Sequence, residues 1–480
     1  MRKIIASGLA ILLLTLLAVS VTADELSTAN TANTASAIGG TSAEELEQFI
    51  QTEFAKTHIP GMSVSIVDAD STLFTGTYGN VSDTRTSFIL GSITKSFTAV
   101  AIMQLAEQGL VDVNSPFVTY LPEEEKNANS KTTVKQLLNH TSGIRTYKTP
   151  KNYSTSAETS PYEYSNSGYG LLGKIVERVS GMDYGSYIKK HIFEPLGMTR
   201  SYVSLKDAKA AGFMADGYRN YFGIMVKQDM PYPYGEINQW LNLPAGYIIS
   251  CTEDMGKYLQ AYLNQGEGIL TPESVNTMMS GQVDFLGTYQ YGMGWMTDLR
   301  ANEKMYVHGG NVENFTTYMH ILPERGIAIV VLTNTCDLFI ANNMMVQLAD
   351  NLAYKVMGAD TVEIGAADYW QSHLLINAAL FIVLLIGLLP LLTLKRWRRK
   401  NREHICTSGI VSLVALHAVL PTLILPIIPI LGIPLSVIRG FVPDIFVVLL
   451  VSSGLLYLTG VLKVGSVAAS RLNRRRSIIE

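Results

Sequence analysis

The chain has little of what would build a metal centre or a disulfide-bonded scaffold. Its 480 residues include three cysteines and eight histidines, and the histidines are scattered instead of standing at the short spacings of metal ligands. A net charge of −3 gives no overall basic surplus for binding nucleic acid. We therefore expect no metal, no other cofactor and no nucleic acid among the partners of this protein.

The three cysteines lie in different parts of the chain. Cys406 adjoins an apolar run and is expected to behave as an inert small hydrophobic residue. Cys251 and Cys336 lie in the central segment, where they could form a disulfide. A sequence gives no distance between two thiols, so this pairing stays open.

Long apolar runs, in contrast, occupy both ends of the chain. A basic start and an apolar run over 4–21 lead to the small residues Val21-Thr22-Ala23. This pattern predicts a secretory signal peptide over 1–23, with an uncleaved N-terminal anchor as the alternative. In either case the residues after Asp24 leave the cytoplasm.

Three more apolar runs follow one another near the C-terminus. Each is long enough to cross about 30 Å of hydrocarbon, so they predict transmembrane helices over 374–394, 405–437 and 441–463. The prolines at 421, 426, 429 and 434 predict that the second helix ends or kinks in its outer half. Buried helices of a soluble domain are the alternative, which three such runs in succession disfavour.

Basic residues predict how these helices are oriented. Six lie between the first and second runs and four follow the third, whereas the loop between the second and third has only Arg439 beside Asp444. The positive-inside rule therefore places the 395–404 loop and the 464–480 tail in the cytoplasm. The central segment then lies outside, carried by a multi-pass protein of the cytoplasmic membrane that contacts membrane lipid.

The central segment is predicted to be globular over 42–357. Residues 24–41, rich in Thr, Ala, Ser and Asn, form a predicted flexible linker, and 358–373 forms a second linker. The capping box Ser42-Ala43-Glu44-Glu45 and the helical spacing of the apolar residues after it predict an amphipathic helix over 43–57.

Strands are predicted at both ends of this segment, with helices between them. The predicted strands are 61–67, 73–78, 317–322 and 326–332, and the predicted closing helix is 339–356. Strands at both ends suit an antiparallel sheet whose termini lie side by side, with helices on its faces. The segment is long enough for one large domain or for two lobes.

The motif Ser92-Ile93-Thr94-Lys95 carries the strongest candidate chemistry. It opens a helix that is apolar on most sides and is therefore predicted to be buried. Lys95 lies one turn after Ser92, so its amine can reach the hydroxyl, and burial lowers the pKa of a lysine until it can accept a proton. The alternative is an N-cap serine beside a solvated lysine, and Ser186-Tyr187-Ile188-Lys189 has the same spacing.

Three further motifs follow in order. In Tyr164-Ser165-Asn166, a tyrosine near a lysine can shuttle protons and an Asn can orient an amide; the alternative is a tyrosine packed on the next helix. In His308-Gly309-Gly310 the glycines allow close backbone approach, and the histidine could bind a carboxylate, tune a proton network or simply occupy a turn. We interpret His140-Thr141-Ser142-Gly143 as architectural.

The ordered set resembles the serine β-lactamase and penicillin-binding-protein superfamily, within it the branch of class C β-lactamases, D-aminopeptidases and esterases. The resemblance covers about 42–357 and implies an α/β, β-lactamase/transpeptidase-like fold. In that fold an antiparallel sheet flanked by helices meets an all-helical lobe at the active site, and here three transmembrane helices follow. Further stretches that resemble the family are Leu137 to Gly143, Tyr164 to Lys174, Pro195 to Met198, Pro244 to Gly246, Tyr291 to Trp295 and Leu332 to Asn334.

The resemblance implies a covalent acyl-enzyme formed on Ser92. Lys95 would activate that hydroxyl, and Tyr164 would exchange protons with Ser92 and the leaving group. Asn166 would contact the substrate amide, and the backbone N–H groups of Ser92 and Asn311 would form an oxyanion hole.

One position departs from the pattern of the family. His308 stands where many relatives have the lysine of a Lys-Thr-Gly motif, which puts potent β-lactamase or carboxypeptidase activity in doubt. His-Xaa-Gly is familiar in the esterase and peptidase relatives. The other residues that the resemblance implies for substrate binding are Gly309, Gly310 and Asn314.

An exported domain of this branch followed by three spans is similar to the prodrug-activating peptidases of the colibactin type. Those enzymes remove an N-acylated D-amino-acid cap from an exported natural product. The resemblance implies a serine hydrolase that cleaves an amide or ester, in a cell-wall fragment or a secreted prodrug with D-residues, with an exporter as a further partner. The alternatives are a sensor acylated at Ser92 without turnover and a non-catalytic membrane scaffold.

Overall fold

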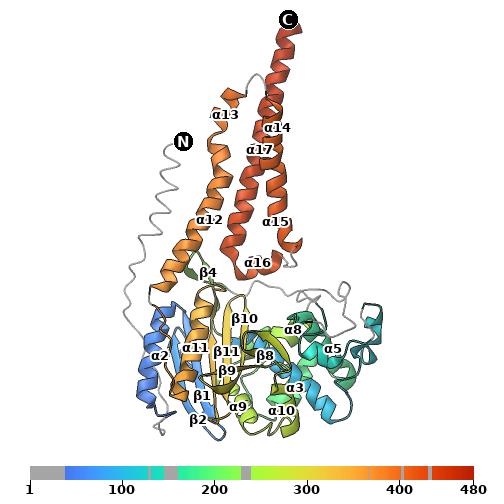
Figure 1. Ribbon diagram of the computed structural model, residues 1–480, viewed down its shortest axis with the longest axis vertical. Helices are drawn as coiled ribbons and strands as arrows, with labels where there is room; N and C mark the ends of the chain where they lie inside the picture. The colour runs from blue at the N-terminus through green and yellow to red at the C-terminus, as the bar shows by residue number, and fades with distance from the viewer. Residues whose placement is uncertain are drawn as a thin grey trace.

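The computed structural model describes residues 38–127, 131–144, 161–228, 239–365, 367–401, 405–430 and 435–479. The predicted signal peptide, most of the first linker and Pro434 lie outside these residues. Within them the chain forms a globular α/β domain from which a helical bundle projects (Figure 1).

One antiparallel sheet of eight strands organises the described part of the domain, in the order β2-β1-β12-β11-β10-β9-β8-β7. The two ends of the domain meet in it, because Val64 of β1 pairs with Val331 of β12. This arrangement confirms the antiparallel sheet with adjacent termini that the strand pattern predicts. The strands are β1 (Gly61–Asp68), β2 (Thr72–Gly79), β7 (Val283–Leu286), β8 (Tyr289–Tyr291), β9 (Met296–Arg300), β10 (Glu303–Val312), β11 (Phe315–Leu322) and β12 (Ile327–Thr333).

Helices cover both faces of this sheet. On one face α2 (Ala43–Thr57) and α11 (Ala341–Met357) pack together over the strands, and the capping box predicted at Ser42 closes the first turn of α2. On the other face α9 (Thr252–Leu263) contacts β1 and β12. Because both faces are covered, all eight residues of β11 and all seven of β12 are buried, as expected for strands inside a layered domain.

A helical lobe adjoins the sheet beyond α9 (Figure 1). One continuous hydrophobic core joins this lobe to the face of the sheet that α9 covers. Its central helix is α3, which is apolar on most sides and buried from Thr94 to Leu105. The predicted fold class, a sheet flanked by helices with an all-helical lobe, is therefore confirmed. The helices of the lobe are α3 (Thr94–Glu107), α4 (Val134–Leu138), α5 (Asn166–Ser180), α6 (Tyr184–Ile188), α7 (Leu205–Ala210), α8 (Gln239–Gly246) and α10 (Pro272–Met279).

Two small sheets complete the domain within the described residues. β3 (Phe88–Ile89) pairs with β6 (Ile249–Ser250) beside the start of α3. β4 (Tyr218–Tyr221) lies between β5 (Ile224–Lys227) and β13 (Thr335–Cys336) at the edge nearest the helical bundle (Figure 1).

Three helical stretches of the bundle are long and apolar enough to cross a membrane, over Asp368–Leu392, Thr407–Ile424 and Pro443–Ser470. The first is α12 (Asp368–Leu392), and a short basic helix, α13 (Leu394–Lys400), continues it. The last is α17 (Pro443–Ile479), whose helix runs on through most of the stretch predicted as a tail.

The second stretch changes its helical pitch in the middle, and its described helix ends at Ile430, before the predicted bound of 437. α14 (Thr407–Val414) passes into a π turn (Ala415–Val419), in which the N–H of Leu420 bonds to the carbonyl of Ala415, and then into α15 (Leu420–Ile430). Pro421 has no N–H for the usual bond one turn back, and the wider turn lies directly before it. Beyond the residues not described at 431–434, α16 (Leu435–Phe441) leads into α17.

α12 is docked on the globular domain by a buried polar cluster. The Asn220 amide donates to Asp337 Oδ2 at 3.0 Å, and His373 Nε2 lies 3.0 Å from the same oxygen. Tyr369 is fully buried and donates its hydroxyl to the carbonyl of Gly223 at 2.9 Å. We call Asn220, Asp337, Tyr369 and His373 the docking cluster. These contacts explain why helix begins at Asp368, inside the segment 358–373 that the sequence predicts as a linker.

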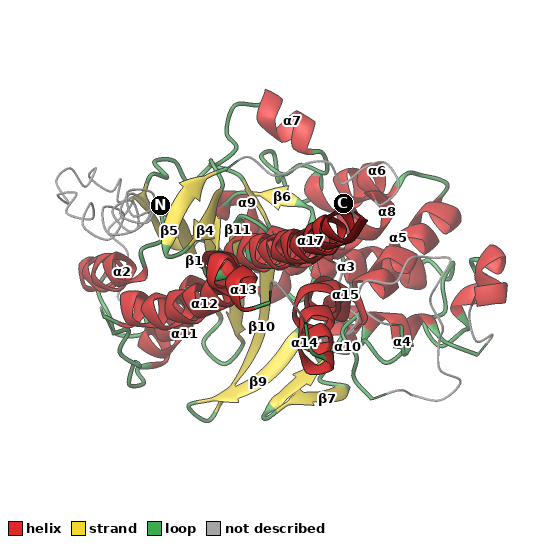
Figure 2. Cartoon of the chain, turned by 90° about the horizontal axis from the view of Figure 1, so that it is seen from above, coloured by secondary structure: helices red, strands yellow, loops and turns green. Residues whose placement is uncertain are grey.

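α16 and the start of α17 also contact the domain. The N–H of Phe222 donates to Asp444 Oδ2 at 3.2 Å, and Gly440 of α16 packs against the side chain of Glu313 at the β10–β11 turn. Seen along the long axis, α14, α15 and α17 stand over β10 and the helical lobe (Figure 2). The bundle therefore rests on the same part of the domain in which the sheet meets the lobe.

Candidate active site

Ser92 lies where the chain turns from strand into helix. β3 leads into a short 3-10 turn, η1 (Gly91–Ile93), which runs directly into α3. Gly91 has a φ of +55°, in the left-handed region that favours glycine, and a methyl group there would lie 2.5 Å from the backbone nitrogen of Asn311. Ser92 is therefore held half-buried at the start of a buried helix, against β10.

Lys95 is the second residue of α3, one turn after Ser92, and is fully buried. Its Nζ lies 3.0 Å from Ser92 Oγ, 2.7 Å from Asn166 Oδ1 and 2.6 Å from the carbonyl oxygen of Ala245. The two shorter contacts are to oxygens that only accept, so they take two N–H donors of the amine. The third partner is a hydroxyl, which can donate its proton to the lone pair of a neutral amine.

Burial lowers the pKa of Lys95 well below its usual 10.5. Its three hydrogen-bond partners are neutral groups, so they do not repay the full cost of burying an ammonium charge. The arrangement can therefore hold a neutral amine 3.0 Å from a serine hydroxyl. This is the geometry that proton transfer from serine to a general base requires.

Tyr164 and Asn166 reach Lys95 from the start of α5. Ser165 is the N-cap of that helix, and its hydroxyl accepts from the N–H of Gly168 at 2.9 Å. The cap fixes the residues on either side of it: Asn166 bonds to Lys95, and the ring of Tyr164 has its centroid 4.7 Å from Lys95 Nζ. The structure thus brings Ser92, Lys95, Tyr164 and Asn166 together from segments far apart in the sequence.

His140 lies behind this group and is completely buried. The N–H of Ser165 donates to its Nδ1 at 3.1 Å, and its ring packs 4.4 Å from that of Tyr164 and 4.6 Å from that of Tyr291. Burial lowers the pKa of His140 well below 6.5. A neutral imidazole that holds the α5 cap fits the architectural role that the sequence indicates.

His308 faces the same group from β10. It is buried, and its Nδ1 lies 2.7 Å from the carbonyl oxygen of Gly309, so that nitrogen carries the proton. Its Nε2 lies 3.2 Å from the Tyr291 hydroxyl, which then donates. Burial lowers the pKa of His308 to about 3. Both ring nitrogens are therefore used within the protein, and the ring is neutral.

The backbones of η1 and β10 approach each other closely at two glycines. A methyl group on Gly310 would lie 2.9 Å from the nitrogen of Ser92 and 2.0 Å from the carbonyl oxygen of Leu90. The missing side chain also lets the Thr317 hydroxyl donate to that carbonyl at 2.6 Å. Together with the contact between Gly91 and the nitrogen of Asn311, these distances show that the backbone of η1 lies directly against that of β10 at Ser92 and Asn311. These are the two residues whose amides are predicted to form an oxyanion hole.

The remaining predicted residues lie less centrally. The Asn311 side chain accepts from the Asn342 amide at 3.1 Å, and Gly309 faces the ring of Tyr318. Asn314 donates to the carbonyl of Gln228 at 3.1 Å and packs on Gly217. It therefore joins the β10–β11 turn to the end of β5 and to the loop before β4.

The competing serine motif and the cysteines lie elsewhere. Ser186 and Lys189 are exposed on the surface of α6 and the turn that follows it. Cys251 and Cys336 are both buried free thiols, so they do not form the disulfide that the sequence left open. Among the residues that the structure describes, no group of three His, Cys, Asp or Glu side chains could hold a metal ion.

Sequence reasoning missed two participants. The carbonyl of Ala245 accepts the shortest hydrogen bond of Lys95, and a backbone oxygen leaves no side-chain signal. Tyr291 is the hydroxyl partner of His308, yet the stretch Tyr291-Gly292-Met293-Gly294-Trp295 drew attention only through its resemblance to the family. Their roles depend on how α8 and β8 pack, which no local pattern encodes.

Comparisons with known proteins agree with this geometry. The sequence matches the protein family described as Beta-lactamase over residues 46–339. It is 26% identical over 324 residues to protein flp of Staphylococcus aureus, covering 61% of this chain and 63% of that protein. The chain therefore spans about three fifths of the length of this curated relative.

Two solved structures extend the comparison. The octameric penicillin-binding protein homologue from Pyrococcus abyssi superposes with a TM-score of 0.58 at 28% identity, covering 66% of this chain and 78% of that one. A D-stereospecific amidohydrolase from Streptomyces sp. has the same fold, with a TM-score of 0.52 at 22% identity, covering 63% and 98%. With more than half of its length matched by the family and the sheet, lobe and serine–lysine pair in place, this chain belongs to the Beta-lactamase family.

Proposed function

We propose that this protein is a membrane-anchored serine hydrolase that cleaves an amide or ester bond outside the cytoplasmic membrane. The observation that carries the proposal is the buried Lys95 amine, which is 3.0 Å from Ser92 Oγ and bonded to two obligate acceptors. Membership of a family that contains hydrolases supports the same conclusion.

The reaction follows from the positions of these groups. Neutral Lys95 takes the proton of Ser92 as Oγ attacks the substrate carbonyl carbon. The amides of Ser92 and Asn311 bind the negative oxygen that develops, and Tyr164 passes a proton to the leaving group. Water then hydrolyses the acyl-enzyme by the same proton path in reverse. Asn166 orients the substrate amide while it holds Lys95.

The substrate we propose is a peptide that contains a D-residue, such as a cell-wall fragment or a secreted prodrug delivered by an exporter. The likeness of fold to a D-stereospecific amidohydrolase supports the stereochemistry. The neutral, internally bonded His308 supports a substrate that does not depend on a fixed positive charge for binding a carboxylate. Gly309, Gly310 and Asn314 would shape the substrate groove along β10.

The location we propose has the globular domain outside and the 395–404 loop and C-terminus in the cytoplasm. The three long apolar helices support membrane anchoring. The basic residues of α13 support the orientation, since Lys and Arg are enriched on the cytoplasmic side.

Covalent labelling of the full-length protein tests the mechanism. A fluorophosphonate probe should label the native chain and the Ser186→Ala control equally, and peptide mapping should find the adduct on Ser92. Ser92→Ala should lose both the label and the hydrolysis of N-acyl-D-amino-acid amides and short-chain esters. Undiminished turnover by Ser92→Ala would refute the mechanism.

A sensor that is acylated at Ser92 without turnover is the second candidate, and one observation favours it. The Asn342 Oδ1 accepts from the N–H of Asp337 at 3.0 Å while its amide donates to Asn311. Polar contacts thus run from α12, through the docking cluster, to a strand of the site. Acylation by a β-lactam that persists for hours, with no measurable hydrolysis of any substrate class, would favour the sensor.

A further inference from the structure

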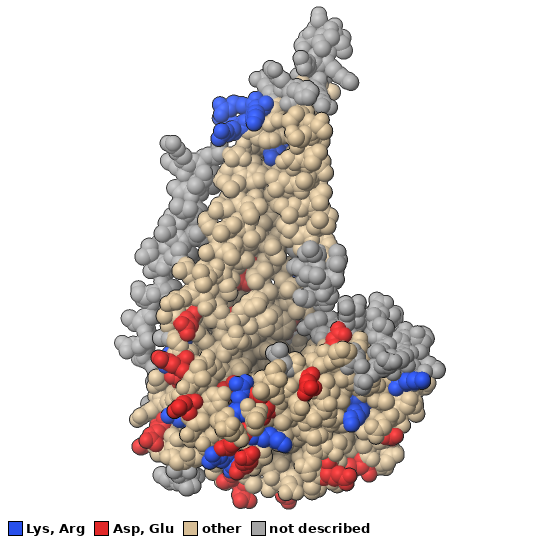
Figure 3. Space-filling view, in the orientation of Figure 1, with Lys and Arg blue, Asp and Glu red and all other residues tan. Residues whose placement is uncertain are grey.

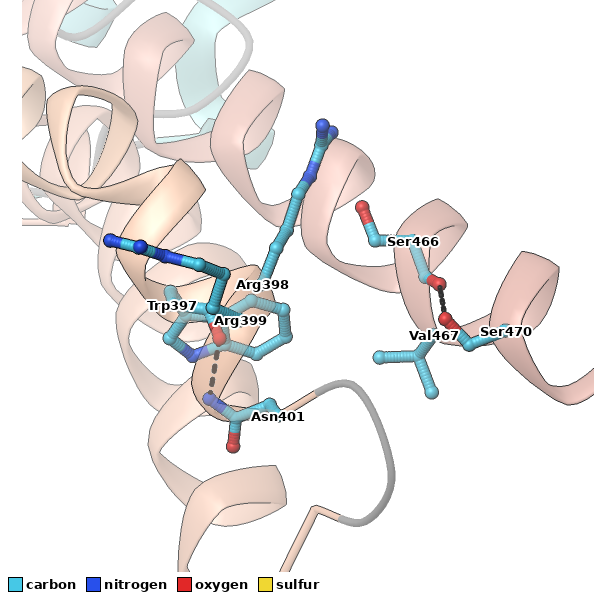
Figure 4. A pocket seen from close by; sticks show the side chains of 7 residues that line it. All are labelled: Trp397, Arg398, Arg399, Asn401, Ser466, Val467 and Ser470. Carbon is cyan, nitrogen blue, oxygen red and sulfur yellow. Dashed lines mark hydrogen bonds between the residues drawn. The ribbon is translucent and has the colours of Figure 1, made fainter.

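A cavity lies at the end of the helical bundle farthest from the globular domain. It has a volume of about 210 Å³ and lies between α13 and the distal half of α17 (Figure 4). Its lining includes Trp397, Arg398, Arg399, Asn401, Ser466 and Ser470.

The wall formed by α17 is made of small residues one turn apart. Ser466 donates its hydroxyl to the carbonyl of Leu462 at 2.6 Å, and Ser470 donates to that of Ser466 at 2.9 Å. Their protons are committed to their own helix, so each oxygen offers the cavity only an acceptor. Larger side chains at these positions would fill the space between the helices.

The wall formed by α13 supplies the donors. Trp397 is fixed from the membrane side by Lys463, whose Nζ lies 5.1 Å from the ring centroid. The two residues after it, Arg398 and Arg399, carry exposed guanidinium groups. In the view of Figure 4 the Arg398 side chain extends toward α17, across the gap from Ser466, whereas the Arg399 side chain extends away from α17.

The charge around the cavity is one-sided. The 395–404 segment has six basic residues and one acidic residue, Glu403, which lies outside the described residues. α17 has no acidic residue after Asp444 within the span Pro443–Ser470. Figure 3 shows the basic side chains gathered at this end, above a surface of uncharged residues. The cavity is therefore built for an anion.

We propose that this cavity binds the phosphate headgroup of an anionic phospholipid. The apolar surface directly below it is lipid-facing: Val461 is 70% exposed and Val464 is 55% exposed. A phospholipid can place its acyl chains along this surface while its phosphate accepts charge-assisted hydrogen bonds from Arg398 and, after a change of rotamer, from the exposed Arg399. Inorganic phosphate shares the charge but lacks the chains.

Such a lipid would bridge two helices that are distant in sequence. α13 continues α12, whose other end is fixed by the docking cluster, and α17 is the longest helix of the described bundle. The headgroup would hold α13 against α17 at the end opposite to that cluster. This inference concerns the membrane helices alone and does not depend on the chemistry proposed for Ser92.

The test measures lipid binding to the full-length protein in detergent by native mass spectrometry. Phosphatidylglycerol is titrated against phosphatidylcholine of the same chain length, and inorganic phosphate is added in a separate arm. The double variant R398Q/R399Q is compared with K395Q/R396Q, which removes the same charge from the same segment but leaves the cavity lining intact. Ser466→Leu fills the cavity without changing any charge.

We expect the native protein to bind phosphatidylglycerol more tightly than phosphatidylcholine. The ratio of the two affinities should fall about tenfold more in R398Q/R399Q than in K395Q/R396Q, because only Arg398 and Arg399 would bond directly to the headgroup. Ser466→Leu should lose the preference while Lys395 and Arg396 remain. If the two double variants lose the lipid preference equally, diffuse surface charge explains the effect and the proposed binding site is refuted. Tight binding of inorganic phosphate with no lipid preference would overturn the assignment to lipid.

Discussion

Gly310→Ala should separate the oxyanion contact from ordinary folding effects. Alanine in place of a strand glycine normally stabilises a protein, by about 0.5–1 kcal/mol, since it restricts the unfolded chain. Here the added methyl group would lie 2.0 Å from the Leu90 oxygen, 2.5 Å from Thr317 Oγ1 and 2.9 Å from the Ser92 nitrogen. Two of these atoms are backbone, so β10 must move away from η1 by an appreciable fraction of an ångström.

That movement would displace one of the two amides that are predicted to form the oxyanion hole. Loss of one oxyanion donor lowers kcat by about 10²–10³-fold, and overpacking costs roughly 1–3 kcal/mol of stability. The assay is the pre-steady-state rate of Ser92 acylation by a chromogenic ester, with urea unfolding measured in parallel.

Gly309→Ala is the matched control. Its methyl group would lie 3.0 Å from ring atoms of Tyr318, a side chain that can turn aside. We expect this variant to keep most of its acylation rate. If Gly310→Ala acylates as fast as Gly309→Ala, the amides of Ser92 and Asn311 do not bind the oxyanion and the reasoning fails.

Three further predictions follow from the buried groups. Lys95→Arg, which stays charged, should lower kcat/KM by about 10²–10⁴-fold. The native enzyme should keep its activity at pH values well below 10.5, because burial lowers the pKa of Lys95. A pH–rate profile of both proteins checks these expectations. His308 has a pKa lowered from 6.5 to about 3, so below pH 6.5 the unfolded chain binds a proton that the folded chain does not. The free energy of unfolding should therefore decrease as the pH is lowered from 6.5 toward 3. His308→Gln should reduce the slope of this free energy against pH by up to about 1.4 kcal/mol per pH unit, as measured by urea unfolding. Asp337→Ala should cost about 1–3 kcal/mol, because it removes the acceptor that the buried Asn220 and His373 share. Thermal unfolding, compared with the exposed Asp360→Ala, measures this loss.

Much of the domain could be predicted from local pattern. The strand pairs at the two ends were identifiable because β1 and β12 are short apolar runs bounded by turn residues, and antiparallel closure follows from their position in the chain. α3 could be recognised as buried because it is apolar on most sides, and burial is what distinguishes Ser92 and Lys95 from the exposed Ser186 and Lys189.

The rest depends on partners that meet only after folding. The tautomer of His308 is set by a hydroxyl from β8 and a carbonyl from its own strand, and neither can be paired with it from sequence. The segment before the first span reads as a linker because Tyr369 and His373 are not apolar. Its helix is stabilised by Asn220 and Asp337, which lie far away along the chain.

The docking cluster has a consequence for which substrates the enzyme can meet. Because α12 is bonded to the domain through Asp337, and α16 touches Glu313 near the site strand, the catalytic serine cannot swing outward on a tether. In the membrane-anchored arrangement that we propose, the fold would therefore fix the height of Ser92 above the bilayer. Molecules close to the membrane would then meet Ser92 more readily than polymer farther out. A domain released by cleavage before Asp368 would lose this restriction, and with it the contacts of Tyr369 and His373 with Asn220 and Asp337.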